Sequence, residues 1–187
     1  MARAPILLAA ALALSACSSR PPWADGQPVI EERPAGSVDE QFARFEARVL
    51  AVHNRERAAV GAPPLRWDPD LARGAASYGP ALAALGKLRH ATPDQRAGQG
   101  ENLWMGTAGA YQLEEMIGHW AAEKSLFRPG RFPHVMTRGK WQDVAHYTQM
   151  IWRGTARVGC AVHTTAKWDF LICRYSPPGN VVGQSVP

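Results

Sequence analysis

The sequence predicts an α+β fold, a class in which helices and antiparallel strands share one core. Two observations carry this prediction. Apolar residues recur at helical spacing in four separate segments, and two strand-like runs follow one another near the C-terminus. The chain of 187 residues is long enough for one domain with a sizeable core, and its hydrophobic fraction of 46% is ordinary for a globular protein.

The N-terminus is typical of a bacterial export signal. Arg3 supplies a positive charge, and the apolar run from Ile6 to Leu14 is too short to remain as a membrane-spanning helix. The Leu-Ser-Ala-Cys ending resembles a lipobox, in which Cys17 is lipidated, and Ser18 after it resembles an outer-membrane sorting pattern. We expect residues 1–16 to be a signal peptide and Cys17 to anchor the protein to the outer membrane, facing the periplasm or the cell surface. An ordinary signal peptide with an incidental cysteine is the alternative.

Residues 17–37 are predicted to form a flexible tether, because Ser18 to Gly36 contains four prolines, two glycines and no hydrophobic periodicity. The domain is expected to span residues 38–187. It begins with a helix that Ser37 caps in the Ser-Val-Asp-Glu box, and we expect this helix to end near Gly61. Its core face is formed by Phe42, Phe45, Val49 and Val52.

Two further helices are expected before residue 125. Asp68-Pro69 resembles an N-cap followed by proline in the first turn, and Gly79-Pro80 predicts a kink or an early end of that helix. The next helix is predicted from Ala110 to Lys124. Between the two, Gly100 to Met105 leads from a loop into an apolar patch, and a long loop is expected from Phe127 to Lys140.

A fourth helix is predicted within Asp143–Arg153, where Val144, Tyr147 and Ile151 share one apolar face. Asp143 is the expected N-cap, which places His146 in the first turn.

A β-hairpin is expected from two strand-like runs, Val158–His163 and Phe170–Tyr175. If the hairpin is centred on Ala166-Lys167, Cys160 lies opposite Cys173 at the separation that a disulfide needs. We therefore predict a Cys160–Cys173 disulfide in an oxidising compartment, with two buried free thiols as the alternative. Residues 176–187 are expected to be coil.

Four motifs occur in order along the chain: His53-Asn54-Arg55-Glu56-Arg57, Gly100-Glu101-Asn102-Leu103, Asp143–Arg153 and Phe170–Asn180. Together they resemble the signatures of the CAP superfamily, which includes cysteine-rich secretory proteins, antigen 5 and plant pathogenesis-related class 1 proteins. The resemblance covers roughly Asp39 to Gly183 and implies a three-layer α-β-α sandwich of the CAP/SCP type. The third motif departs from the family pattern at Ala145, where a glycine or a charged residue is usual.

The resemblance also implies a cavity site formed by His90, Glu101, Glu123 and His146. Two neutral imidazoles bind Zn²⁺ or a similar divalent ion, and glutamates orient imidazoles or act as bases, so Glu101 and Glu123 are the catalytic candidates. The alternative is a metal-free His/Glu network, and the sequence leaves both open. The expected supporting residues are Asn102, Tyr147, Thr148 and Gln149, while His53 and Asn54 are expected to have structural roles. His119, near Glu123 on the same helix, is expected to lie outside the site.

Several functional classes are excluded or disfavoured. The net charge of +5 is spread without a Lys/Arg run, which suits an anionic envelope surface and predicts no nucleic-acid partner. The His-Glu-x-x-His and Gly-x-Ser-x-Gly motifs are absent, as is a phosphate-binding glycine loop. We expect an envelope binding module for a lipid, glycan or other small ligand, lipid binding being a property of eukaryotic relatives. A divalent-metal-dependent hydrolase and a structural or adhesion protein are the alternatives, and the sequence does not indicate an oligomeric state.

Overall fold

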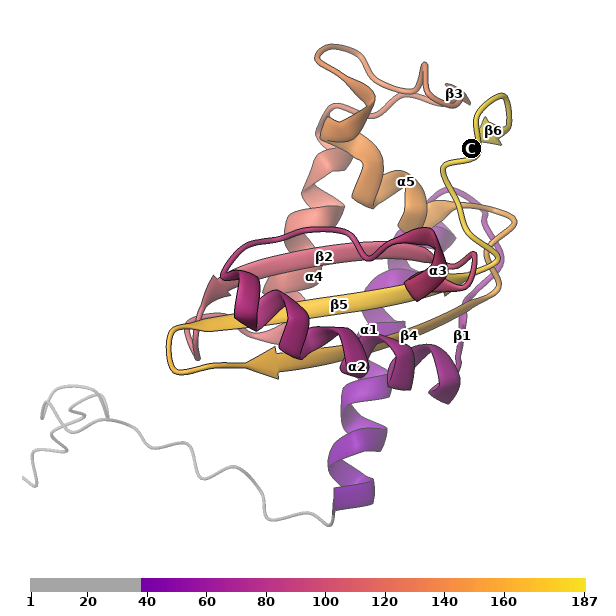
Figure 1. The fold of residues 1–187 in the computed structure, drawn as a ribbon. Coiled ribbons are helices and arrows are strands. Elements are labelled where there is room, and N and C mark those ends of the chain that lie inside the picture. Colours follow the sequence, from indigo (N-terminus) through magenta and orange to yellow (C-terminus); the bar gives the residue numbers. More distant parts are fainter. Residues whose placement is uncertain (1–37) are drawn as a thin grey trace, which may run out of the picture. The chain divides into compact units, whose positions relative to one another are not determined.

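A computed structural model describes residues 38–187, with side chains from residue 43. The expected signal peptide (1–16), the lipidation site at Cys17, the tether to residue 37 and the Ser37 cap lie outside the described residues. The described part contains a four-stranded sheet between helices (Figure 1). None of the helices within residues 38–187 combines the length and apolar character needed to cross a membrane.

The described residues form the following helices, 3₁₀ helices and strands, given in chain order. They are α1 (Val38–Ala59), β1 (Arg66–Trp67), α2 (Pro69–Leu85), α3 (Pro93–Arg96), β2 (Gly100–Thr107), α4 (Leu113–Ala122), the 3₁₀ helix η1 (Glu123–Ser125), β3 (Gly130–Arg131), the 3₁₀ helix η2 (Trp141–Val144), α5 (Ala145–Ile151), β4 (Arg157–Thr164), β5 (Trp168–Ser176) and β6 (Ser185–Val186).

The main sheet has the strand order β1-β4-β5-β2. The expected hairpin supplies the two central strands, β4 and β5, while β2 pairs antiparallel with β5 and β1 pairs parallel with β4. Cys160 is the register partner of Cys173, and the two are disulfide-bonded, so this prediction is confirmed.

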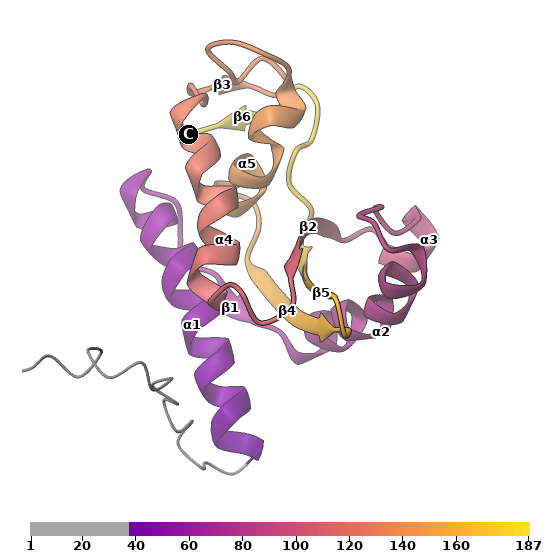
Figure 2. The ribbon, with the colours of Figure 1, turned by 90° about the vertical axis from the view of Figure 1, so that its left-hand side faces the viewer.

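Helices cover both faces of the sheet, which confirms the three-layer α-β-α arrangement. In Figure 2, α2 and α3 lie on one side of the strands and α1, α4 and α5 on the other. Each interface has its own apolar core: Tyr78, Leu82, Phe170 and Ile172 lie between α2 and the sheet. The opposite core contains Val49, Val52, Trp104, Ile117, Trp120, Met150, Val158 and Leu171.

The predicted helix boundaries are partly confirmed. Asp68 caps α2 by accepting bonds from the Asp70 and Leu71 N–H groups, and α1 ends just before Gly61, whose φ is +67°. The predicted early end at Gly79-Pro80 is wrong, because α2 continues to Leu85. Buried residues before and after the proline, such as Tyr78 and Leu82, hold this helix against the sheet and outweigh the lost backbone hydrogen bond.

Four other expectations need correction. The third helix begins at Leu113 rather than Ala110, because Ala110 belongs to a turn in which Gly109 has a φ of +72°. Asp143 caps the preceding 3₁₀ helix by accepting a bond from the Lys140 N–H, so it is not the cap of α5. The segment from Gly100 is a complete strand, and the C-terminal coil contains β6, which pairs with β3 inside the expected long loop.

Candidate functional site

The first His–Glu pair joins the segment after α2 to the edge strand β2. His90 Nδ1 lies 2.7 Å from Glu101 Oε1, which also accepts a hydrogen bond from the Ala91 N–H at 3.0 Å. The Glu101 side chain is fully buried, whereas that of His90 is 59% exposed. The carboxylate therefore fixes one nitrogen of an imidazole whose other side remains accessible.

Arg174 balances the buried charge of Glu101. It is the register partner of Glu101 on β5, and its Nη2 lies 3.1 Å from Glu101 Oε2 as an ion pair that is not aligned as a hydrogen bond. The guanidinium also lies over the Tyr78 ring, 5.5 Å from the centroid. Burial lowers the pKa of Arg174, and the charge of Glu101 opposes this change. No role for Arg174 was expected from the sequence, although a charged residue within an apolar strand is a signal of a buried ion pair.

The second pair connects the end of α4 to the start of α5. Glu123 Oε1 lies 2.5 Å from His146 Nδ1, and Glu123 Oε2 accepts hydrogen bonds from the backbone N–H groups of His146 and Tyr147, both at 3.0 Å. Glu123 thus satisfies two N–H groups at the N-terminus of α5, where a negative charge is favourable. Trp120, one turn earlier, stacks on the His146 ring at a centroid distance of 5.9 Å.

A chain of hydrogen bonds holds both pairs near the same end of β2. Asn102, next to Glu101, donates through Nδ2 to the His146 carbonyl at 3.1 Å and to the Tyr175 hydroxyl at 3.3 Å. Neighbouring residues of a strand point to opposite faces, so Glu101 and Asn102 face different layers. The two pairs therefore flank the edge strand. Within residues 38–187, no three His, Cys, Asp or Glu side chains lie close enough together to hold a metal ion.

His53 anchors the other end of this chain. Its Nδ1 lies 2.9 Å from the Val49 carbonyl and therefore carries the proton, which leaves Nε2 to accept from the Tyr175 hydroxyl at 2.9 Å. Burial lowers the pKa of His53 to about 4 and raises that of Tyr175 well above its usual range. Asn54 hydrogen-bonds both the N–H and the C=O of Leu65, so the two residues join α1 to the Tyr175 hydroxyl and to the segment before β1.

The residues after His146 mainly hold the C-terminal segment. Thr148 donates to Asn180 Oδ1 at 2.7 Å, and Gln149 accepts from the Gly179 N–H at 2.9 Å and donates to Thr155. Tyr147 is buried, and burial together with the charge of Glu56 raises the pKa of its hydroxyl. Of these three, Tyr147 contacts a His–Glu pair, through its main chain.

His119 lies in a separate aromatic cluster. Its Nδ1 accepts a hydrogen bond from Trp104 Nε1 at 2.7 Å, and its ring stacks on that of Trp104. Because Nδ1 accepts this bond, Nε2 carries the proton, and the ring contacts of His119 are with Trp104 and Tyr111 rather than with either His–Glu pair.

The carboxylates of the pairs act as orienting groups. Each glutamate binds a histidine Nδ1 with one oxygen, while the second oxygen is engaged by Arg174 or by backbone N–H groups. Both imidazoles consequently retain Nε2 for a ligand. This matches a common arrangement of metal-binding histidines, in which a carboxylate fixes the tautomer and raises the basicity of the other nitrogen.

Comparisons with known proteins agree with the fold and the motifs. A model of the family described as "CAP: Cysteine-rich secretory protein family" matches residues 50–175. Pathogenesis-related protein 1C of Nicotiana tabacum is 36% identical over 137 residues, covering 73% of this chain and 77% of the relative. The crystal structure of NaASP2 with Zn²⁺ has a TM-score of 0.61 at 23% identity, covering 75% of this chain and 83% of the other. Na-ASP-1 has a TM-score of 0.64 at 23% identity, covering 75% of this chain and 40% of the other. The chain therefore belongs to the CAP, or cysteine-rich secretory protein, family.

Proposed function

We propose that this protein is an exported, lipid-anchored binding module of the bacterial envelope whose two His–Glu pairs bind a divalent metal ion, with zinc as the first candidate. The main observation behind the proposal is the hydrogen bond between each histidine Nδ1 and a glutamate carboxylate oxygen. This contact prepares the opposite nitrogen, Nε2, of His90 and His146 as a metal ligand.

The donor set fits a weak metal site. Neutral imidazole suits zinc and other first-row divalent ions, but two histidines are fewer than the roughly three or four protein ligands of stable zinc sites. We therefore expect an affinity below that of structural zinc sites. The crystal structure of NaASP2 with Zn²⁺ supports zinc as the ion to test, although NaASP2 is a different protein that shares only the fold at this level of identity.

The same contacts favour binding over hydrolysis. A general base needs a carboxylate oxygen that is available to a bound water. Glu101 directs its two oxygens to His90 and Arg174, and Glu123 directs its oxygens to His146 and the start of α5. Their engagement supports a structural and orienting role for the two catalytic candidates, so the metal-dependent hydrolase is not our proposed function.

Attachment to the membrane through Cys17 and recognition of a lipid or glycan complete the proposal. The N-terminal Leu-Ser-Ala-Cys sequence supports the anchor, and membership of a family of secretory proteins supports export. A module held at the envelope surface meets lipids and glycans at high local concentration, which suits modest affinity per site.

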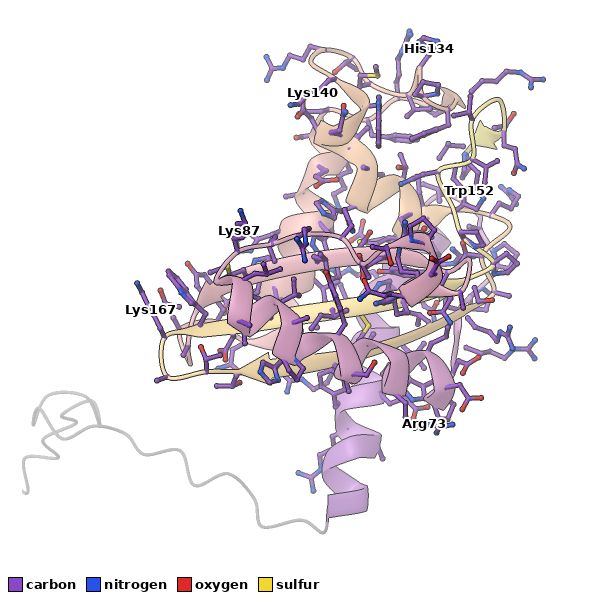
Figure 3. The ribbon with its side chains drawn as sticks, viewed as in Figure 1. Arg73, Lys87, His134, Lys140, Trp152 and Lys167 are labelled. Atoms are coloured by element: carbon purple, nitrogen blue, oxygen red, sulfur yellow. A yellow bond between two sulfur atoms is a disulfide. The ribbon has the colours of Figure 1, made fainter. Side chains whose placement is uncertain are left out.

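Calorimetric titration of ZnCl₂ into the purified full-length protein tests the metal site. We expect one ion per chain with an affinity on the order of micromolar, lost in both His90→Ala and His146→Ala if the two histidines share the ion. His134→Ala is the matched control, because His134 is an exposed histidine on the loop far from the main sheet in Figure 3.

The stoichiometry separates a shared ion from two independent pairs. If each pair bound its own ion, each single variant would retain one of two equivalents. Zinc binding that persists unchanged in the His90→Ala/His146→Ala double variant, while its circular dichroism spectrum shows a native fold, would refute the proposed metal site.

A further inference from the structure

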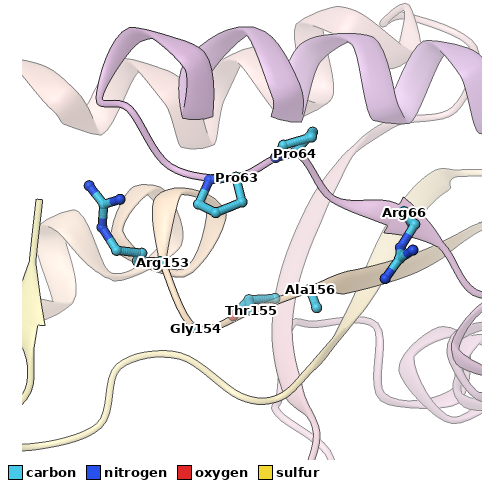
Figure 4. Close-up of a pocket in the computed structure, with 7 residues that line it drawn as sticks. All are labelled: Pro63, Pro64, Arg66, Arg153, Gly154, Thr155 and Ala156. Atoms are coloured by element: carbon cyan, nitrogen blue, oxygen red, sulfur yellow. The ribbon is translucent and has the colours of Figure 1, made fainter.

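A pocket of about 360 Å³ lies on the chain away from both His–Glu pairs, and neither pair contributes to its walls. This volume is within the range of small-molecule sites. One wall comes from the segment that leads from α1 to the first residue of β1, and the other from the turn between α5 and β4 (Figure 4). The lining residues are Pro63, Pro64, Arg66, Arg153, Gly154, Thr155 and Ala156.

Arg57 ties the two walls together from behind. Its guanidinium is fully buried and donates to the carbonyls of Pro63 at 2.6 Å and Thr155 at 2.8 Å, one from each wall. Two further bonds go to the Met150 and Trp152 carbonyls, both at 2.9 Å. In addition, the Arg66 N–H donates to the Ala156 carbonyl at 3.0 Å. These bonds fix both walls without a ligand, so the pocket is preformed.

The surroundings of the pocket are strongly positive. Burial lowers the pKa of Arg57 to about 10, so this residue remains charged at neutral pH, and its hydrogen-bond partners are carbonyls rather than carboxylates. Arg66 and Arg153 are exposed and stand at opposite ends of the pocket in Figure 4. Among the described residues, neither forms an ion pair with a carboxylate, whereas the neighbouring Arg157 is paired with Asp68 at 3.4 Å.

The wall between the two arginines is apolar in character. Pro63 and Pro64 present their rings along one side, and Ala156 contributes a methyl group to the other. Arg153 is held at its end by a hydrogen bond from Nη1 to the Gly61 carbonyl at 2.9 Å, which leaves its other guanidinium donors for a ligand. Charged donors on a rigid apolar wall are the elements of a site for an amphipathic anion.

We propose that this pocket binds a small organic anion, with a carboxylate, phosphate or sulfate group held by Arg66 and a compact apolar body packed on Pro63 and Pro64. Arg153, at the other end of the pocket, adds positive charge without contacting the same oxyanion. Arginine is the side chain best suited to such oxyanions, because its planar donors match their geometry. The buried charge of Arg57 adds a field that is poorly screened by salt. This site is independent of the metal site proposed above, and the two proposals are tested separately.

Phenyl phosphate is the test ligand, because it combines an oxyanion with a compact apolar ring. Its binding is measured by two-dimensional ¹H–¹⁵N NMR titration of the full-length protein, with inorganic phosphate and phenol titrated in parallel. We expect saturable shifts centred on the amides of Gly154, Thr155 and Ala156. Phosphate and phenol should each bind more weakly, because each carries half of the recognised chemistry.

The variant Arg66→Gln should weaken phenyl phosphate binding by about tenfold, the effect of one lost charge-assisted hydrogen bond. Arg153→Gln removes only a charge at the far end of the pocket and should weaken binding by less than Arg66→Gln does. Lys167→Gln is the control for net charge. It removes the same charge at the hairpin turn, at the opposite end of β4 from Arg66 and far from Trp152 in Figure 3. Its affinity should stay within about twofold of wild type.

Vesicle sedimentation distinguishes a lipid headgroup from a soluble molecule as the source of the anion. The protein for this measurement carries Cys17→Ser, so that no lipid anchor contributes. Sedimentation with phosphatidylglycerol vesicles that is lost in the Arg66→Gln/Arg153→Gln double variant would assign the oxyanion to a lipid headgroup, whereas phenyl phosphate binding without arginine-dependent sedimentation would assign it to a soluble molecule. The proposal is overturned if phenyl phosphate produces no saturable shifts at residues 154–156, or if the folded double variant binds it as well as the wild type.

Discussion

Acidification should destabilise the domain through His53, because this histidine must be neutral to hold its neighbours. Its Nδ1–H donates to the Val49 carbonyl, so Nε2 accepts from the Tyr175 hydroxyl, which in turn accepts from Asn102. Protonation of Nε2 removes the acceptor and places a charge at a fully buried position. The perturbation is thus a fall in pH, and the variant His53→Gln removes the titrating group while keeping a neutral acceptor.

The magnitude follows from the two pKa values of His53. Burial, as the largest cause, lowers the pKa from 6.5 in the unfolded reference to about 4 in the folded protein. Since the folded state binds this proton less readily, the stability due to neutral His53 is complete above pH 6.5 and is lost as the pH falls toward 4. Linkage gives a loss of about 2 kcal/mol by about pH 5 and about 3 kcal/mol once both states are protonated.

Urea unfolding monitored by circular dichroism at a series of pH values from neutral to about pH 4.5 measures this loss directly. At neutral pH, His53→Gln should be less stable than the wild type by about 1–2 kcal/mol, because the fit of the hydrogen-bond chain is disturbed. The difference should shrink as the pH falls, since only the wild type carries the His53 titration. His134→Gln, at an exposed histidine, should follow the wild-type profile.

Parallel pH profiles for the wild type and His53→Gln would refute the reasoning. They would show that His53 is not the group that couples protonation to unfolding, and that the neutral tautomer does not contribute to stability in this window.

Two other stability changes follow from the fold. Removing the disulfide with Cys160→Ala/Cys173→Ala should lower the free energy of unfolding by about 3 kcal/mol, because the bond closes a loop with a sequence separation of 13. Equal urea midpoints for the variant and its parent would contradict this prediction. Gly159→Ala should lower the free energy of unfolding by about 3 kcal/mol, because the new Cβ would meet the backbone of α2. In the control Gly118→Ala, in α4, the new Cβ meets no atom within 4 Å. This control should be neutral or stabilising by about 1 kcal/mol in thermal melts. A Gly159→Ala variant as stable as its parent would show that α2 moves freely on the sheet.

The local features of this fold were predictable because they leave local patterns. The Cys160–Cys173 bond followed from a hairpin centred on Ala166-Lys167, which places the two cysteines opposite each other, and the start of α2 followed from Asp68-Pro69. Strand β2 was not predicted as a strand, because its residues from Gly100 to Trp104 are all buried. Strand β5 is also buried on both faces, but it reads as a nearly continuous apolar run, whereas Glu101 and Asn102 interrupt the apolar residues of β2, so neither alternation nor an apolar run identifies it.

The sequence by itself determined the approximate positions of the helices α1, α2, α4 and α5, the hairpin and its disulfide, and the residue types from which a His/Glu site is made. Only the tertiary structure decided how these residues pair: His90 with Glu101, and His146 with Glu123, on either side of β2. It also assigned Arg174 to the charge of Glu101. The reason is physical. A hydrogen bond or ion pair between residues many positions apart depends on the register of the strands and on the packing of the helices. The sequence spacing of the two bonded residues encodes neither the register nor the packing.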